Sequence, residues 1–250
     1  MDALIIAAGY GSRLREISDS KPLAPVAGVP LLELGVRQAR AAGVERVVVV
    51  TGHHAIEIEK FLPSLSARVG IPIISERLQH WSTPNGHSVV AGAAQIAKMG
   101  GGDYLLLMAD HIFDSSILPR LAKVGTKSRG VTLAIDRRSS SPLIDPEDAT
   151  WVKLDADARI EAIGKSLPEY DAVDCGAFLA TPELAAAIKA AIADGKEGSL
   201  SDGMQRLADA GRAATMDIGD AWWLDVDDPR SHALAEAEAP KFLPELFAAA

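Results

Sequence analysis

The chain contains 250 residues, 48% of them hydrophobic, with one cysteine and a formal net charge of −9 at pH 7. The length suits one α/β domain with a sizeable core, the negative charge argues against binding of nucleic acid or anionic membranes, and a single cysteine excludes an internal disulfide. Because no apolar stretch reaches the roughly 18 residues of a membrane span and the N-terminus lacks the basic region of a signal peptide, we expect a cytoplasmic protein without stable membrane insertion.

The first half of the chain alternates strand and helix signals. Short apolar runs predict strands at residues 4–6, 46–51, 71–75 and 104–108, and the second of these contains four consecutive valines, as in a strand buried on both faces. Helices are predicted between them, over residues 31–42, 55–62 and 88–97. Strands that alternate with helices indicate a mostly parallel sheet with right-handed crossovers.

The second half has more strand signals and fewer helices between them. Strands are predicted at residues 131–135, 150–154, 159–163, 173–179 and 214–218, and helices at residues 182–193, 200–210 and from 229 onward. The polar stretch 137–148 is rich in serine and proline. We interpret it as an active-site flap rather than a linker, because neither side has an obvious core of its own. Residues 1–250 are therefore expected to form a single domain.

A glycine-rich turn follows the first strand. Its sequence is Ala7-Ala8-Gly9-Tyr10-Gly11-Ser12-Arg13-Leu14, and Lys21-Pro22-Leu23 comes shortly after it. Such a turn lets backbone N–H groups approach phosphate oxygens, and the cations Arg13 and Lys21 suit a triphosphate whose charge grows on a pyrophosphate leaving group. Leu14 stands at the place of the third glycine of a dinucleotide fingerprint, and no Gly-Lys-Ser/Thr closes a Walker loop.

These two segments resemble the signature of the sugar-nucleotide pyrophosphorylase-like nucleotidyltransferases, and the resemblance extends over almost the whole chain. It implies an α/β fold of the GT-A-like, Rossmann-related type, with three layers and a mixed, mostly parallel central sheet. It also implies that Ala7, Ala8, Gly9, Gly11 and Ser12 bind the nucleotide together with the two cations. Ser20 precedes Lys21 where many members carry proline or lysine, a departure that leaves the key cation in place.

Carboxylates occur at two places that suit a metal ion. Asp110 follows the strand 104–108, and a carboxylate at the carboxyl end of a parallel strand faces the ligand crevice. Asp225 and Asp227 are two residues apart on an expected strand, so both can point to one face. Magnesium prefers one or two carboxylates with phosphate oxygens and waters. The resemblance assigns Mg²⁺ to these positions, with Asp225 favoured over Asp227, although Ala109 replaces a common glycine.

The run Asn85-Gly86-His87-Ser88 opens a predicted helix. One interpretation is a capping turn with Asn85 or Ser88 as the cap, and the other is a loop that contacts the nucleobase edge, as a glycine-rich turn does in related transferases. The two interpretations are compatible, and both stay open. His111 is a candidate for the rim of the site because it adjoins Asp110.

Three residues of the second half are candidates for binding the acceptor. Lys165 follows a hairpin and matches the position where relatives place a lysine against the acceptor phosphate. Lys153 lies on the neighbouring strand and is also assigned to the site. Asp174 could accept hydrogen bonds from a polyol.

The expected reaction is attack of an acceptor phosphate oxygen on the α-phosphorus of CTP, with release of pyrophosphate. A phosphate monoester has its second pKa at about 6 and is largely dianionic at neutral pH, so no general base is required. Catalysis then depends on Arg13, Lys21 and Lys165 and on the metal, through positioning and charge neutralisation.

The acceptor is harder to predict than the reaction. Residues 145–154 and 170–174 most resemble inositol-1-phosphate cytidylyltransferases. Phosphocholine and aminoethylphosphonate cytidylyltransferases and sugar-1-phosphate nucleotidyltransferases are the alternatives within the family. A non-catalytic nucleotide-binding module is the alternative from another class, and it is disfavoured because the metal carboxylates are present. The sequence leaves open whether the chain forms a homo-oligomer.

Overall fold

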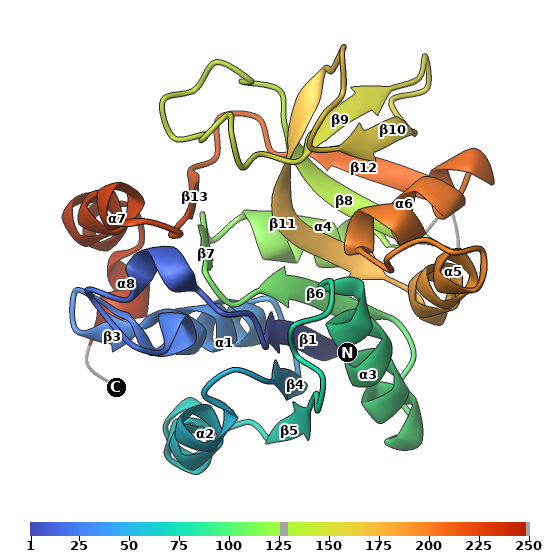
Figure 1. Cartoon of the computed structure of the whole chain (residues 1–250). Helices are drawn as coiled ribbons and strands as arrows, with labels where there is room; N and C mark the ends of the chain where they lie inside the picture. The colour runs from blue at the N-terminus through green and yellow to red at the C-terminus, as the bar shows by residue number, and fades with distance from the viewer. Residues whose placement is uncertain (126–129, 249–250) are drawn as a thin grey trace.

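A nine-stranded mixed sheet forms the centre of the computed structural model, which describes residues 1–125 and 130–248 (Figure 1). The strands follow the order β10-β9-β11-β6-β1-β4-β5, with β8 pairing with both β11 and β12. Their bounds are β1 Asp2–Ala7, β4 Arg46–Thr51, β5 Ile73–Arg77, β6 Tyr104–Met108, β8 Val131–Asp136, β9 Trp151–Leu154, β10 Ile160–Gly164, β11 Ala172–Ala180 and β12 Ala213–Asp217.

The two halves of the sheet differ in strand direction. Strands β1, β4, β5 and β6 are parallel to one another, as the alternation of strands and helices predicts. The valines of β4 are completely buried because helices cover both faces of this part of the sheet. Strand β11 runs antiparallel to β6, β8 and β9, and β10 runs antiparallel to β9. Strands β8, β9 and β12 therefore keep the direction of β6, whereas β10 and β11 run against it, and the second half of the sheet is mixed.

Helices cover both faces of the sheet and give three layers. One buried cluster joins the sheet to α1, α2 and α4, and a second joins its other face to α3, α5 and α6. The bounds are α1 Leu31–Ala41, α2 Ala55–Val69, α3 Gly86–Lys98, α4 Ile117–Val124, α5 Pro182–Ala193 and α6 Leu200–Asp209. No helix in the described ranges is long and apolar enough to cross a membrane.

A third cluster packs the C-terminal helices against the early part of the chain. It joins α7 (Pro229–Phe242) and α8 (Pro244–Phe247) to α1 and to the hairpin of β2 (Pro25–Val26) and β3 (Val29–Pro30). The small sheet of β7 (His111–Phe113) and β13 (Trp223–Asp225) lies next to it, and its register pairs Asp225 with His111. This pairing brings the C-terminal carboxylates beside the end of β6.

The structure lengthens one expected helix, shortens one expected strand and adds short elements that were not expected. Helix α2 continues to Val69 through Pro63, because Leu62, Leu65 and Val69 all bury their side chains against the sheet. Strand β13 ends at Asp225, so Asp227 lies beyond the strand. The alternation of side chains along a strand therefore does not place Asp227 on the same face as Asp225. The short β7 and α4 have too few residues for a periodic signal and were not predicted.

Candidate active site

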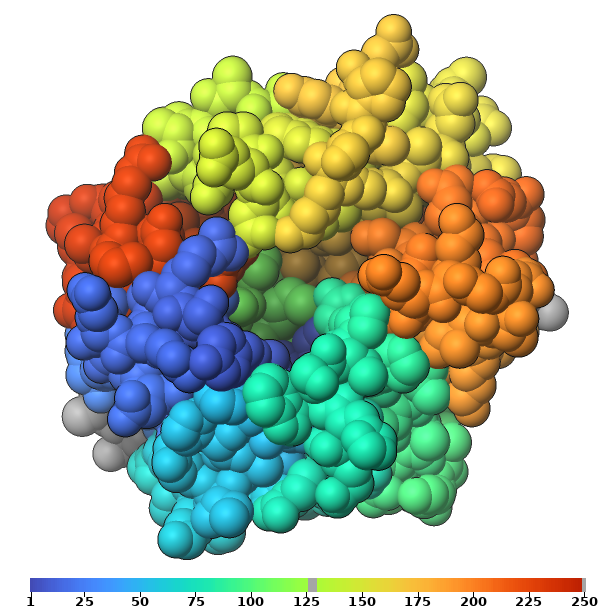
Figure 2. Space-filling view, viewed as in Figure 1, coloured from blue at the N-terminus to red at the C-terminus, as the bar shows by residue number. Residues whose placement is uncertain are grey.

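Two adjoining cavities lie at the carboxyl ends of β1 and β6. The loop cavity, of ≈ 300 Å³, is lined by the glycine-rich turn, Lys21, Trp81 and Asp110. The flap cavity, of ≈ 320 Å³, is lined by the flap 137–148, by β10 and β11, and by residues near the start of α7. Asn85, Met108 and Asp227 line both. Figure 2 shows the shared opening as a central hollow with the green β6–β7 region at its floor.

The glycine-rich turn adopts the conformation that its sequence predicts. Gly11 has φ of 58°, in the left-handed region, and a Cβ at this position would collide with the Cβ of Lys21. The chain then forms a short 3-10 helix, Ser12–Leu14, whose Leu14 is completely buried and anchors the turn to the core. Ala7, Ala8, Gly9 and Gly11 line the loop cavity, whereas Ser12 is exposed and lines neither cavity.

A network of ion pairs, in which cations and carboxylates alternate, connects the two cavities. Lys21, which is only 7% exposed, lies 2.5 Å from Asp110 and also pairs with Asp227. Arg13 pairs with Asp227 and with Asp148 of the flap, and Lys165 pairs with Asp148. Arg13 lines the flap cavity and lies at the border of the loop cavity through its contact with Asp227. The three cations predicted to take part in catalysis therefore belong to one network.

The carboxylates lie in two overlapping groups. The ligand atoms of Asp110, His111 and Asp225 all lie within 4.8 Å of one another, and so do those of Asp148, Asp225 and Asp227. The imidazole Nδ1 of His111 is 2.8 Å from Asp110 Oδ1 and 3.6 Å from Asp225 Oδ1. Asp225 belongs to both groups because β13 pairs with β7 while the segment after it approaches the flap.

The surroundings shift the pKa values of these groups in different directions. Burial acts to raise the pKa of Asp110, but Lys21 and His111 hold it below its ordinary value. The pKa of His111 would be lowered by burial, but Asp225 and Asp110 raise it to about 9. The pKa of Asp225 is raised by burial, and Asp110 adds to this effect. The neighbouring cations His111 and Lys21 act to lower the pKa of Asp225 but do not offset the effect of burial.

These residues fit a hard divalent cation. Oδ1 of Asp225 is buried and has no hydrogen-bond partner in the part of the chain that the structure describes. An orphaned carboxylate oxygen beside a second carboxylate is the donor set that a hard cation takes. Asp110 and Asp225 are the pair that could hold such an ion. Asp227 pairs with both Arg13 and Lys21, whereas Oδ1 of Asp225 has no hydrogen-bond partner among the described residues, so Asp225 is the more available of these two.

The Asn85–Ser88 turn differs from the expected capping turn. Neither Asn85 nor Ser88 caps α3, because Asn85 Oδ1 accepts the N–H of Leu200 at 2.8 Å and Ser88 lies within the helix. A Cβ on Gly86 would collide with the carbonyl of Gly198, so glycine permits close contact with the segment before α6. Asn85 and Ser88 line the loop cavity, whereas Gly86 lines neither cavity.

The structure separates the three predicted acceptor residues. Lys165 and Asp174 line the flap cavity. Asp174 Oδ1 accepts the N–H of Gly176 at 2.7 Å, and burial raises the pKa of Asp174 to about 6. Lys153 lines neither cavity, so the structure does not bring it together with the other two. Its Nζ lies 3.5 Å from Asp171 and 3.8 Å from Glu169, which hold it at the outer side of the sheet.

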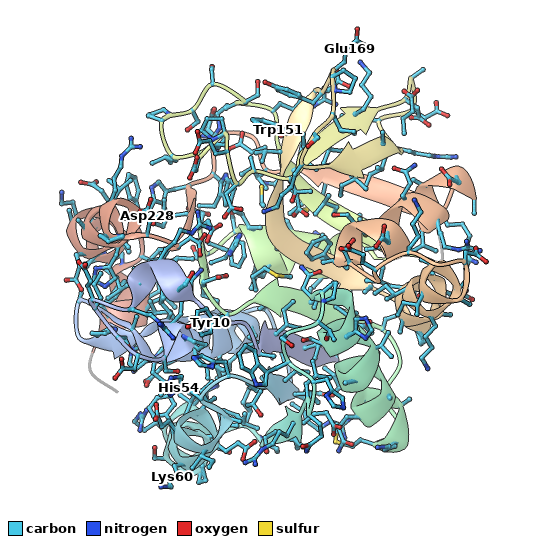
Figure 3. The ribbon with its side chains drawn as sticks, in the orientation of Figure 1. Tyr10, His54, Lys60, Trp151, Glu169 and Asp228 are labelled. Carbon is cyan, nitrogen blue, oxygen red and sulfur yellow. The ribbon has the colours of Figure 1, made fainter. Side chains whose placement is uncertain are left out.

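Several cavity residues were missed by the sequence analysis. Trp81 and Thr83 line the loop cavity, and Asp148 and Arg230 line the flap cavity. Trp81 faces Tyr10 in a stacked arrangement, with ring centroids 6.0 Å apart, and His53 packs against both. In Figure 3, Asp228, which lines the flap cavity, lies to the left of the centre of the view, with Trp151 above it and Tyr10 below it. Trp81 and Thr83 belong to an irregular segment without a motif, and Arg230 lies in the first turn of α7, so no sequence signal marked them. Asp148 ends the predicted flap, but nothing singled out this residue within it.

Comparison with known proteins gives consistent relatives. Residues 3–209 match the model of the MobA-like NTP transferase domain. A protein of Rubrobacter xylanophilus named bifunctional IPC transferase and DIPP synthase is 35% identical over 94% of this chain and 51% of its own length. The CMP-5'-(3-aminopropyl)phosphonate synthase of Streptomyces rubellomurinus is 30% identical over 91% of this chain and 37% of its own length. The chain thus spans about half of the Rubrobacter protein.

Solved structures share the fold. The inositol-1-phosphate CTP transferase of T. maritima superimposes with a TM-score of 0.78 at 24% identity, covering 94% of each chain. A putative glucose-1-phosphate thymidylyltransferase from Bacillus anthracis superimposes with a TM-score of 0.81 at 20% identity, covering 96% of this chain and 95% of that one. The predicted GT-A-like fold class is therefore confirmed.

Proposed function

This chain belongs to the family of MobA-like NTP transferase domains, and on this premise we propose that it transfers CMP from CTP to inositol 1-phosphate, releasing pyrophosphate. The observation that carries the proposal is the pair of adjoining cavities, which share one carboxylate cluster and have a cation on each side. One cavity suits the nucleotide and the other suits the acceptor. We also propose that residues 1–250 act as one domain and work in the cytoplasm.

The choice of CTP and of a polyol phosphate is supported by the relatives. The T. maritima protein is named as an inositol-1-phosphate CTP transferase, and the Streptomyces protein as the synthase of a phosphonate linked to CMP. The flap cavity carries Lys165 for a phosphate group and the Asp174 carboxylate for hydroxyl groups. A site built to bond hydroxyls rejects analogues that lack them, because its own polar groups are then left unpaired.

A second acceptor class is favoured by one observation. The flap cavity contains several carboxylates, among them Asp145, Asp174 and Asp228, which would also attract an ammonium group. The Streptomyces relative is named for an aminopropylphosphonate product. An aminoalkylphosphonate is therefore the alternative acceptor, and it requires the same nucleotide chemistry in the loop cavity.

The residues of the two cavities support a direct transfer. An oxygen of the acceptor phosphate attacks the α-phosphorus of CTP, the bond from that phosphorus to the bridging oxygen breaks, and pyrophosphate leaves. Lys21 and Arg13 stabilise the charge that develops on the leaving group, and Lys165 orients the acceptor phosphate. Asp110 and Asp225 would hold Mg²⁺, which neutralises phosphate charge when bound. The acceptor needs no general base because it is already a dianion.

The test is a pyrophosphate-release assay that combines four nucleoside triphosphates with inositol 1-phosphate, phosphocholine, aminoethylphosphonate, aminopropylphosphonate and glucose 1-phosphate. We expect the highest kcat/KM for CTP with inositol 1-phosphate. Asp225→Asn serves as the matched control for contaminating activity. A higher kcat/KM for any other acceptor would overturn the inositol assignment, and a preference for another nucleotide would overturn the CTP assignment.

A further inference from the structure

Asp148 lies at the end of the flap and contacts a cation from each side of the site. Its Oδ2 accepts from the Arg13 guanidinium, and its Oδ1 accepts from the Lys165 ammonium. Figure 2 shows the yellow-green flap approaching the blue glycine-rich segment at the rim of the hollow. One carboxylate thus bridges Lys165, which lines the flap cavity, and Arg13, which also pairs with Asp227 at the border of the loop cavity.

The local backbone presents this carboxylate to the two cations. The N–H groups of Asp148 and Ala149 both donate to the carbonyl of Asp145, at 3.2 and 2.9 Å, which closes a turn at the end of the flap. The side chain of Asp145 accepts the N–H of Glu147 at 3.0 Å and completes the turn. Arg138 fixes the beginning of the flap, through its bonds to Asp136 and to the carbonyl of Ala221.

The two ion pairs of Asp148 are suited to exchange. The side chains of Arg13 and Lys165 are 45% and 60% exposed, so each pair contributes little stability in solvent. The neighbouring cations still hold the pKa of Asp148 below its ordinary value against the effect of burial, so it is an anion at neutral pH. A phosphate group carries up to two charges and three acceptor oxygens and therefore replaces a single carboxylate at an exposed cation.

We propose that Asp148 is a positioning residue that couples the two cavities, because its one carboxylate holds both Arg13 and Lys165 until phosphate groups replace it. The triphosphate that takes Arg13 displaces Asp148, and the displacement leaves Lys165 ready for the acceptor phosphate. Each substrate then increases the affinity for the other by the same factor, as linkage requires. This inference rests on the proposed function, since it assigns the two cations to two phosphate-bearing substrates.

The experiment measures the movement of the flap and the coupling together. Glu147 is exposed and Cys175 is buried, so Glu147→Cys provides a selective position for an environment-sensitive fluorophore beside Asp148. The labelled protein is titrated with the non-transferable analogue α,β-methylene-CTP and Mg²⁺, with and without inositol 1-phosphate. We expect the nucleotide to change the fluorescence, and the acceptor to increase nucleotide affinity about fivefold or more.

Two variants in the same labelled background decide the role of Asp148. In Asp148→Asn the carboxylate no longer competes, so we expect tighter binding of each ligand alone and no coupling between them. Asp145→Asn is the matched control, because asparagine retains the oxygen that accepts the Glu147 N–H while it removes the same charge. Coupling that persists in Asp148→Asn, or that is lost equally in Asp145→Asn, would overturn the proposal.

Failure of the proposed function gives a different pattern. If inositol 1-phosphate is not the acceptor, it binds neither the parent nor Asp148→Asn and releases no pyrophosphate in the parent. The fluorescence response to the nucleotide alone then tests the proposal. Displacement of Asp148 predicts a response in the parent that is absent in Asp148→Asn, and an identical response in both proteins contradicts it.

Discussion

The loop cavity and the flap cavity are assembled from the sequence in different ways. The walls of the loop cavity come largely from the segment 6–22 and the stretch 81–88, and both follow parallel strands of the first half. The flap cavity takes its walls from the flap, β10, β11, α6 and the start of α7. A cavity whose walls come from one or two continuous segments can be recognised from a sequence motif. A cavity whose walls come from many segments depends on how distant strands pack together. The two cavities adjoin at the carboxylates Asp110, Asp225 and Asp227.

The largest effect is expected where the two cavities meet. Asp110→Asn or Asp225→Asn should lower kcat about 100-fold or more, because each removes an anionic ligand from the cation that would serve both substrates. Pyrophosphate release at saturating Mg²⁺ measures the loss, and circular dichroism shows whether the fold is kept. Asp227→Asn should lose less, since its carboxylate is engaged by Arg13 and Lys21. Near-normal turnover in both variants would refute the metal assignment.

A smaller effect is expected in the loop cavity alone. Lys21→Ala should lower kcat by about 10- to 100-fold and raise the KM for CTP much less, because the charge of the leaving group develops in the transition state. The buried position of Lys21 between Asp110 and Asp227 means that its loss also leaves two carboxylates uncompensated. Lys21→Arg is the control that keeps the charge. An unchanged kcat with a raised KM would mean that Lys21 only binds ground-state CTP.

The difference between the cavities explains what the sequence could predict. The glycine turn, Lys21, Asp110 and the four parallel strands are marked by short, continuous patterns, and the structure brings these residues together. Lys165 was found through resemblance, and it does line the flap cavity. Lys153 lies outside both cavities, because a strand pattern indicates two faces but not which face meets the cavity. Asp148 carried no signal, because its partners Arg13 and Lys165 are 135 and 17 residues away.

A still smaller effect is expected on the acceptor side, where the two predicted acceptor lysines can be compared. Lys165→Ala should raise the KM for the acceptor about tenfold, the value of one charge-assisted hydrogen bond, with little change in the KM for CTP. Lys153→Ala should change both constants less than about twofold, because its ion pairs lie at the surface with Glu169 and Asp171. Equal losses in the two variants would mean that Lys165 acts only through overall charge.

The smallest effect is expected from Asp174, and it is one of stability. Burial raises the pKa of this carboxyl to about 6, against about 3.9 for an exposed aspartate, so the folded protein binds more protons than the unfolded chain between these values. The contribution of Asp174 to folding stability therefore falls as the pH rises from about 4 to 6, and the destabilisation by its buried charge is fully present above pH 6.

The amide introduced by Asp174→Asn cannot ionise, so the variant avoids this destabilisation. The Tm of Asp174→Asn minus that of the parent should increase by a few degrees between about pH 4.5 and 7.5, without divalent cations. Any constant effect of the amide cancels in this difference, so a Tm difference that does not change with pH would contradict the raised pKa.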